Sequence, residues 1–265
     1  MPRRARREST TNIYHVMLRG INRQNIFQDR EDNAKYLWTV GKIKEASGFD
    51  LYAYCFMPNH IHLLLKVGSE PLAHIMKRLG ASYVYWYNQK YERCGHLFQD
   101  RFKSEPVEDD RYLLTVTRYI HQNPVKAGLT ADLAGYQWSS YNDYLHKYRP
   151  LIDRTFILSL FDSNPTKALQ AFKQFNQEKN SDFCLDYDED QGPNPYIADQ
   201  EVVGFIQTIG GLEKPNQLKE IDKKKRNTLL IELLGRGAKI RQLARITGIS
   251  RGTIASLKLK TKVKN

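Results

Sequence analysis

The sequence has few cysteines, and their spacing suits neither a disulfide framework nor a thiolate metal site. Only three occur, Cys55, Cys94 and Cys184, and none belongs to a CxxC pair. A disulfide-stapled secreted domain needs a dense, even set of cysteines, and a zinc site built from thiolates needs closely spaced ones. We therefore expect these three residues to be structural thiols.

Long apolar runs are missing as well. A membrane-spanning helix requires roughly 18 uninterrupted apolar residues, and polar residues interrupt every apolar stretch of this chain. The N-terminal stretch MPRRARRESTTN is basic, but no apolar segment follows it as in a signal peptide. We expect a cytoplasmic protein with no membrane partner.

Acidic residues are in the minority. The chain has 41 Lys and Arg against 29 Asp and Glu, a formal charge of +12. Such an excess attracts polyanions, so nucleic acid is the first partner to expect, at the prokaryotic nucleoid. With 265 residues, the chain is long enough for one large or two smaller domains.

The periodicity of the first half predicts an α+β domain. Apolar patterns and turn residues indicate the order strand, helix, strand, strand, helix, strand, helix. The segments lie at 13–18, 32–46, 51–56, 61–67, 72–91, 96–107 and from 109 or 110 to Pro124. Gly48 is expected to end the first helix, and Pro124 to end the last. This order predicts a ferredoxin-like antiparallel sheet with helices on one face.

The second half predicts a small all-α domain. Residues 136–150 look irregular, residues 156–177 look helical, and an acidic run at 182–190 precedes Gly192-Pro193-Asn194-Pro195. We expect three parts. They are a first domain at 1–150 with a basic arm at 1–11, a helical connector with an acidic linker at 151–195, and a helical domain at 196–265.

The stretch KIRQLARITGISRGTIASLKLK predicts a helix-turn-helix. Apolar residues follow helical spacing on both sides of Gly248, which suits a turn, and Ser250 can cap the second helix. Residues of that helix free to approach the major groove of duplex DNA would be Arg251, Thr253, Ser256 and Lys258. The alternative is a helical bundle that contacts protein and has a solvated basic face.

Two histidines stand two residues apart in MPNHIHLLLKV. His60 and His62 would project from the same face of a strand, so both imidazoles can reach one metal ion. Histidines on sheets are also common as ordinary hydrogen-bonded residues. On an otherwise apolar strand, however, their nitrogens need partners, which a metal would supply.

The helix containing RYIHQNPVKAGL offers two further candidates. Tyr119 and Asn123 are four residues apart and share one helical face. Asn123 can supply an amide oxygen as a third ligand, and a tyrosine beside a metal-bound phosphate can act as a nucleophile. The product, a phosphotyrosine ester, could be resealed without ATP. Both residues also have plainer interpretations, since helices bury tyrosines and an asparagine before proline is common at helix ends.

Together these motifs resemble those of the single-tyrosine HUH transposases, the IS200-like and repeat-associated tyrosine transposases. YHVMLRG and LFQDRFKS are similar to family patterns too, and the resemblance covers roughly residues 10–145. It implies that His60, His62 and Asn123 bind Mg²⁺ or Mn²⁺. It also implies that Tyr119 attacks single-stranded DNA at hairpin-forming repeats, forms a 5′-phosphotyrosine link and releases a 3′-hydroxyl.

One departure from the family pattern leaves alternatives open. IS200-type enzymes usually carry Gln as the helix ligand. This chain has Asn123 at that position, which resembles the pattern of the repeat-associated branch. His121 stays a second candidate ligand and Tyr112 a second candidate nucleophile. Two imidazoles would also accept Zn²⁺, Ni²⁺ or Co²⁺. The resemblance to IS200-like enzymes implies a dimer, and the resemblance to the repeat-associated branch implies a monomer. A monomer or a homodimer is therefore expected.

Basic residues outside these motifs are candidates for DNA binding. The N-terminal arm carries Arg3 and Arg4, and Arg101 and Lys103 lie near the expected site, although Arg101 could equally pair with an acidic neighbour. Duplex DNA would be a second partner through the C-terminal domain. The leading hypothesis is a transposase that cuts and rejoins single strands. The alternatives are a non-catalytic DNA-binding regulator and a metal-dependent nuclease that uses water.

Overall fold

The computed structural model describes residues 6–146, 151–180, 182, 184–185, 197 and 199–262. The chain divides into two compact units. The first comprises residues 1–21 and 25–187, and the second comprises residues 22–24 and 188–265. Among the described residues, no helix is both long and apolar enough to cross a membrane.

The first unit is built on a four-stranded antiparallel sheet with the order β2-β3-β1-β4. Its strands are β1 (Ile13–Arg19), β2 (Asp50–Met57), β3 (His60–Lys66) and β4 (Lys103–Pro106), with the 3₁₀ turn η1 (Ile21–Arg23) after β1. Helix α1 (Arg30–Ser47) connects β1 to β2, and α2 (Leu72–Lys90) connects β3 to β4. This βαββαβ order confirms the predicted ferredoxin-like α+β fold.

Helices α1 and α2 cover one face of this sheet. Asp29 caps α1 by accepting a hydrogen bond from the backbone N–H of Asp32, and Gly48 ends the helix with φ +65°, as predicted. The ring of Tyr36 in α1 packs edge to face against Phe56 of β2 and Tyr83 of α2. Its centroid lies 5.1 Å from that of Phe56 and 5.0 Å from that of Tyr83. Aromatic and aliphatic burial therefore holds this layer together.

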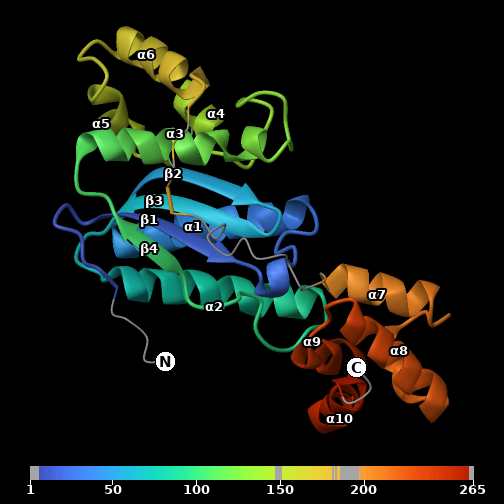
Figure 1. Cartoon of the computed structure of the whole chain (residues 1–265). Coiled ribbons are helices and arrows are strands. Elements are labelled where there is room, and N and C mark those ends of the chain that lie inside the picture. The colour runs from blue at the N-terminus through green and yellow to red at the C-terminus, as the bar shows by residue number, and fades with distance from the viewer. Residues whose placement is uncertain are drawn as a thin grey trace. The chain divides into compact units, whose positions relative to one another are not determined.

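Helix α3 (Asp110–Lys126) packs on the opposite face, against β2 and β3, and Figure 1 shows α2 and α3 on opposite sides of the sheet. The prediction that the helices lie on one face of the sheet is therefore wrong, because α3 follows the last strand and covers the face that α1 and α2 leave open. Asp109 caps it by accepting from Tyr112 N at 2.7 Å. The prediction that Pro124 ends this helix is wrong, because Pro124 lies inside its last turn. A proline there removes only one helical hydrogen bond. The helix continues to Lys126, and the N–H of the C-cap residue Ala127 still donates to the Asn123 carbonyl at 2.9 Å.

Three more helices follow in the first unit: α4 (Tyr141–Leu145), α5 (Arg154–Ser159) and α6 (Pro165–Gln177). The expected helical stretch at 156–177 is thus broken, because Asn164 caps a new helix that begins at Pro165. Phe172 of α6 stacks on Tyr144 of α4 with ring centroids 4.3 Å apart. Helices from the range expected as a connector therefore belong to the core of the first unit.

The described part of the second unit is helical, as predicted. It contains α7 (Asp199–Thr208), the 3₁₀ turn η3 (Pro215–Lys219), α8 (Lys223–Gly235), α9 (Ile240–Thr247) and α10 (Arg251–Lys262). Gly248 ends α9 with φ +66°, and Ser250 accepts from Thr253 N at 3.2 Å to cap α10. Leu230, Leu243 and Ile254 are fully buried between α8, α9 and α10. The last two helices have the predicted helix-turn-helix arrangement.

Candidate active site

The sheet face under α3 carries most of the polar strand residues. Side chains alternate along a strand, so His15 and Arg19 of β1 share a face with His60 and His62 of β3. The register agrees, because Arg19 pairs with His60 and Met17 pairs with His62. A helix that packs on this face meets imidazoles, whereas on the other face β1 and β3 present residues such as Val16, Leu18 and Leu63.

The two histidines of β3 lie side by side on that face. Their ring centroids are 5.0 Å apart and the rings are nearly perpendicular, at 84°. His60 Nδ1 lies 2.7 Å from Asn59 Oδ1. Since that amide oxygen can only accept, Nδ1 donates, so in the neutral form of the ring the lone pair is on Nε2.

His62 is fully buried between β1 and α3. Its Nδ1 lies 2.9 Å from His15 Nε2, and its Nε2 lies 3.4 Å from the Asn123 amide nitrogen. Burial, and then the neighbouring His60 and His15, hold the pKa of His62 well below its ordinary value. The ring is therefore neutral at pH 7, which is the form that binds a metal.

Tyr119 and Asn123 face the histidines from α3. The Tyr119 ring packs edge-on against His62 and His15, with centroids 5.8 and 6.1 Å away. Both α3 side chains are buried, and only 7% of Tyr119 and 8% of Asn123 is exposed. The structure thus brings His60, His62, Tyr119 and Asn123 together from segments about 60 residues apart.

This donor set fits one divalent ion. Two ligands of one ion, each about 2.1 Å from it, lie about 3.0 to 3.4 Å apart. The 3.4 Å between His62 Nε2 and the Asn123 amide agrees with that spacing. A half-turn of the amide would exchange its nitrogen for its oxygen. In the described part of the chain, no three His, Cys, Asp or Glu side chains form a complete cluster. The ligands would therefore be two imidazoles and an amide, completed by water or phosphate oxygens.

Comparison with known proteins shows that the segment carrying this site is similar to one family. The family model described as Transposase IS200 like matches residues 8–123, which run from before β1 to Asn123. Residues 8–123 are therefore similar to IS200-like transposases. The match includes both histidines of β3, Tyr119 and Asn123, and it confirms the resemblance expected from the sequence motifs.

Individual relatives resemble parts of the chain. A Haemophilus influenzae protein named as a REP-associated tyrosine transposase is 28% identical over 106 residues, which cover 36% of this chain and 60% of that protein. A solved structure of a REP-associated tyrosine transposase bound to a REP hairpin aligns with TM-score 0.47, 16% identity, 55% of this chain and 86% of that one. A solved protein of Deinococcus radiodurans, described as a transposase, aligns with TM-score 0.33, 18% identity, 45% of this chain and 95% of that one.

The alternative ligand and the alternative nucleophile point away from this site. The two ring nitrogens of His121 lie 2.9 Å from Asn176 Oδ1 and 2.9 Å from Ser140 Oγ. Burial lowers the pKa of His121 to about 4. Tyr112 donates to Glu105 at 2.7 Å, and its burial raises the pKa of the phenol. Neither side chain is directed at the histidine pair of β3.

Sequence reasoning missed two residues of this candidate site. His15 lies in the YHVMLRG stretch, two positions before Met17, and the alternation of β1 was a signal for it. Lys126 follows Tyr119 by seven residues on one helical face, and its ammonium lies 5.5 Å from the centre of the Tyr119 ring. Lys126 also lines a cavity of about 820 Å³ at the end of α3, together with Lys173 and Asn180.

Of the predicted DNA-binding residues in the first unit, the structure describes Arg101 and Lys103. Arg101 is exposed, and Lys103 is half-buried on β4, on the face that carries His15. The predicted Arg3 and Arg4 lie outside the described residues. Arg6, the first described residue of the basic arm, stacks its guanidinium on Phe102 at 3.8 Å and bonds the Phe102 carbonyl at 3.1 Å.

In the second unit, the predicted contact residues lie on α10. Arg251 and Ser256 are exposed, whereas Thr253 is half-buried and its hydroxyl is 2.8 Å from Ser250 Oγ. The side chain of Lys258 lies outside the described residues. Arg251 and Ser256 are therefore the exposed members of this set among the described residues, and the Ser256 hydroxyl donates to the Thr253 carbonyl at 2.8 Å.

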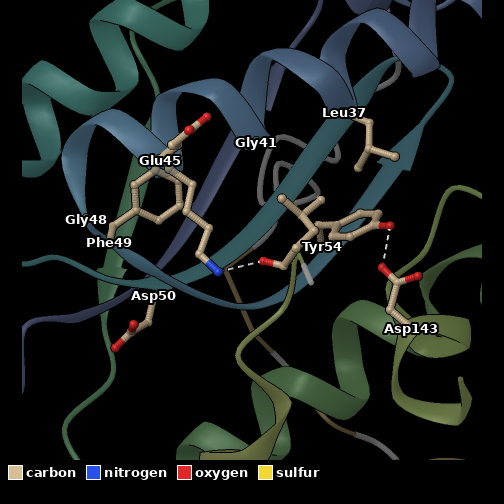
Figure 2. Close-up of a pocket in the computed structure, with 10 residues that line it drawn as sticks. Leu37, Gly41, Glu45, Gly48, Phe49, Asp50, Tyr54 and Asp143 are labelled. Carbon is tan, nitrogen blue, oxygen red and sulfur yellow. Dashed lines mark hydrogen bonds between the residues drawn. The ribbon is translucent and has the colours of Figure 1, made fainter. Parts of the chain in front are cut away.

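A second cavity of the first unit is lined by none of the candidate site residues His60, His62, Tyr119 and Asn123. It has a volume of about 780 Å³, and Leu37, Gly41, Phe49 and Tyr54 are among the residues that line it (Figure 2). The Tyr54 hydroxyl donates to Asp143 at 2.7 Å at one side of this cavity (Figure 2). We assign it no role in the chemistry.

Proposed function

We propose that the first unit is a transposase domain, which cleaves and rejoins single-stranded DNA through a covalent bond to Tyr119. Mg²⁺ or Mn²⁺ would be held by His60, His62 and Asn123. The observation that carries this proposal is the position of the Tyr119 ring against His62, whose Nε2 is also beside the Asn123 amide. A nucleophile and a metal-ligand set on one buried face support phosphoryl transfer over simple DNA binding.

The proposed reaction is a transesterification. The Tyr119 oxygen loses its proton and attacks phosphorus, a new P–O bond forms, and the P–O3′ bond breaks to leave a 3′-hydroxyl. A divalent ion would supply Lewis-acid polarisation of the phosphate. The Lys126 ammonium, 5.5 Å from the Tyr119 ring, is placed to stabilise negative charge that develops on the phosphate. The reverse attack by a 3′-hydroxyl reseals a strand without ATP.

We infer that the substrate is a single strand beside a hairpin-forming repeat. The Haemophilus influenzae relative is named as REP-associated, and the formal charge of +12 supports a polyanionic partner. The chain spans 60% of the length of its curated relative. The helix-turn-helix unit would contact duplex DNA through Arg251 and Ser256. Either a monomer or a homodimer could perform this reaction.

The test uses end-labelled hairpin oligonucleotides from repeats that flank the gene. Wild type, Tyr119→Phe and Tyr112→Phe are each incubated with the DNA and Mn²⁺, and protein-linked DNA is resolved on denaturing gels. Wild type and Tyr112→Phe should form the adduct, because Tyr112 is bonded to Glu105 and is not directed at the histidines. Tyr119→Phe, and wild type with chelator, should form none.

The two alternative functions give other outcomes. Cleavage without an adduct, retained in Tyr119→Phe, would identify a nuclease that uses water. Binding without cleavage across several flanking repeats would identify a DNA-binding regulator. Each result would contradict the proposed tyrosine chemistry.

A further inference from the structure

We propose that His15 is a positioning residue, which holds the ring of His62 so that its Nε2 faces the metal position beside Asn123. This inference rests on the proposed metal site. His15 is neither in the predicted ligand set nor a group that touches the DNA.

The position of His15 supports a direct contact with the candidate ligand. It is fully buried in the middle of β1, between Leu64 of β3 and Glu105 of β4 in the strand register. Its Nε2 lies 2.9 Å from His62 Nδ1, and the two rings stack at 27° with centroids 5.2 Å apart. A ring held both by stacking and by a hydrogen bond has little freedom to rotate.

The direction of that hydrogen bond decides whether His62 can bind a metal. A neutral imidazole carries one N–H, so a hydrogen on Nδ1 leaves the lone pair on Nε2. If His15 Nε2 accepts from His62 Nδ1, then His62 Nε2 presents its lone pair toward Asn123. If the direction were reversed, His62 Nε2 would carry a hydrogen and could not be a ligand. An acceptor at position 15 therefore selects the metal-binding tautomer.

His15 also contacts the proposed nucleophile. Its ring meets the Tyr119 ring edge-on, with centroids 6.1 Å apart at 67°. Its neighbours on the same face of β1, Ile13 and Met17, are apolar and buried. A buried imidazole at this position is costly unless its hydrogen bond has a use, and an apolar residue would satisfy packing alone.

The test compares His15→Leu, which removes the acceptor, with His15→Gln, whose amide oxygen can replace Nε2. Mn²⁺ affinity of the full chain without DNA is measured by titration calorimetry, and stability by urea unfolding. We expect His15→Leu to weaken Mn²⁺ binding about 10- to 100-fold and His15→Gln to recover most of the affinity. Met17→Leu, a neighbour on the same strand face without a polar atom, is the matched control and should bind as wild type does.

The outcomes separate this inference from the metal site on which it rests. Wild-type affinity in a folded His15→Leu would overturn the role of His15 while leaving the metal site intact. Wild type that binds no Mn²⁺, or binds it equally after His62→Ala, would contradict the metal site itself and with it the positioning role. If His15→Leu does not fold, the ¹⁵N spectrum of wild-type His62 decides. A hydrogen on Nδ1 supports the inference, and a hydrogen on Nε2 overturns it.

Discussion

The two faces of the central sheet are built from the same strands and have different contents. Toward α1 and α2, β3 presents Ile61, Leu63 and Leu65, all fully buried. Toward α3, the same strand presents His60 and His62. Strand alternation separates these two sets by a single residue. The face toward α1 and α2 therefore stabilises the fold by apolar burial. The face toward α3 carries buried polar groups, which are destabilising unless they are hydrogen-bonded.

The comparison extends to the helices. The layer formed by α1 and α2 is held by aromatic rings such as Tyr36 and Tyr83. Within the described residues, the fully buried imidazoles are His15, His62 and His121, on β1, β3 and α3. Each depends on a hydrogen-bond partner from another element, because an unpaired buried nitrogen would be destabilising. Side chains are fully buried on both faces of the sheet. The faces differ in chemistry, because the imidazoles can bind a metal ion and the apolar side chains cannot.

The largest expected effect follows from His60→Ala. His60 is only half-buried, so the free energy of unfolding should change by less than about 1 kcal/mol. Loss of a metal ligand should lower the rate of adduct formation by about 10³-fold, since a Lewis acid contributes several kcal/mol to such a reaction. Rate and stability are measured on the same preparation. A variant with near wild-type adduct formation would contradict the functional assignment of the α3 face.

The opposite face should respond in the opposite way. Leu63→Ala removes a fully buried side chain and should cost about 2 to 5 kcal/mol of unfolding free energy, measured by urea denaturation. Adduct formation per folded molecule should stay within a few-fold of wild type. If this variant lost catalysis without losing stability, the division of roles between the two faces would be wrong.

Buried imidazoles should also make stability depend on pH. The pKa of His121 is about 4 in the folded chain, against an ordinary 6.5. Between these values the unfolded chain binds the proton more readily. The free energy of unfolding therefore contains a pH-dependent contribution from His121. This contribution is complete above pH 6.5, decreases as the pH falls, and is lost at about pH 4. It amounts to roughly 3 kcal/mol. His121→Gln should flatten the pH dependence measured by urea unfolding from pH 4 to 7, and an unchanged slope would contradict this.

The smallest effect concerns Lys126. If its ammonium stabilises charge beside Tyr119, Lys126→Ala should slow adduct formation about tenfold, the equivalent of one charge-assisted hydrogen bond. Lys173→Ala is the matched control, because Lys173 lines the same cavity but is not in contact with Tyr119. Equal slowing in both variants would indicate a general effect of positive charge on DNA binding.

Local patterns predicted the fold and most of the site. Alternation and capping signals placed β1, β3 and α3, and helical spacing put Tyr119 and Asn123 on one face. The contact between His15 and His62 could not be predicted, because it depends on the register of strands 47 residues apart. Lys126 was missed because Pro124 was expected to end the helix. Nothing local indicated that Asn176 of α6 would bind His121.

The most direct test is to find which residue carries the DNA. Wild type is incubated with Mn²⁺ and the flanking-repeat oligonucleotide, digested with protease and nuclease, and analysed by tandem mass spectrometry. The account predicts a nucleotide on Tyr119, in the peptide that also contains Asn123. A nucleotide on Tyr112 or on any other tyrosine, or cleaved DNA with no modified peptide, would contradict it.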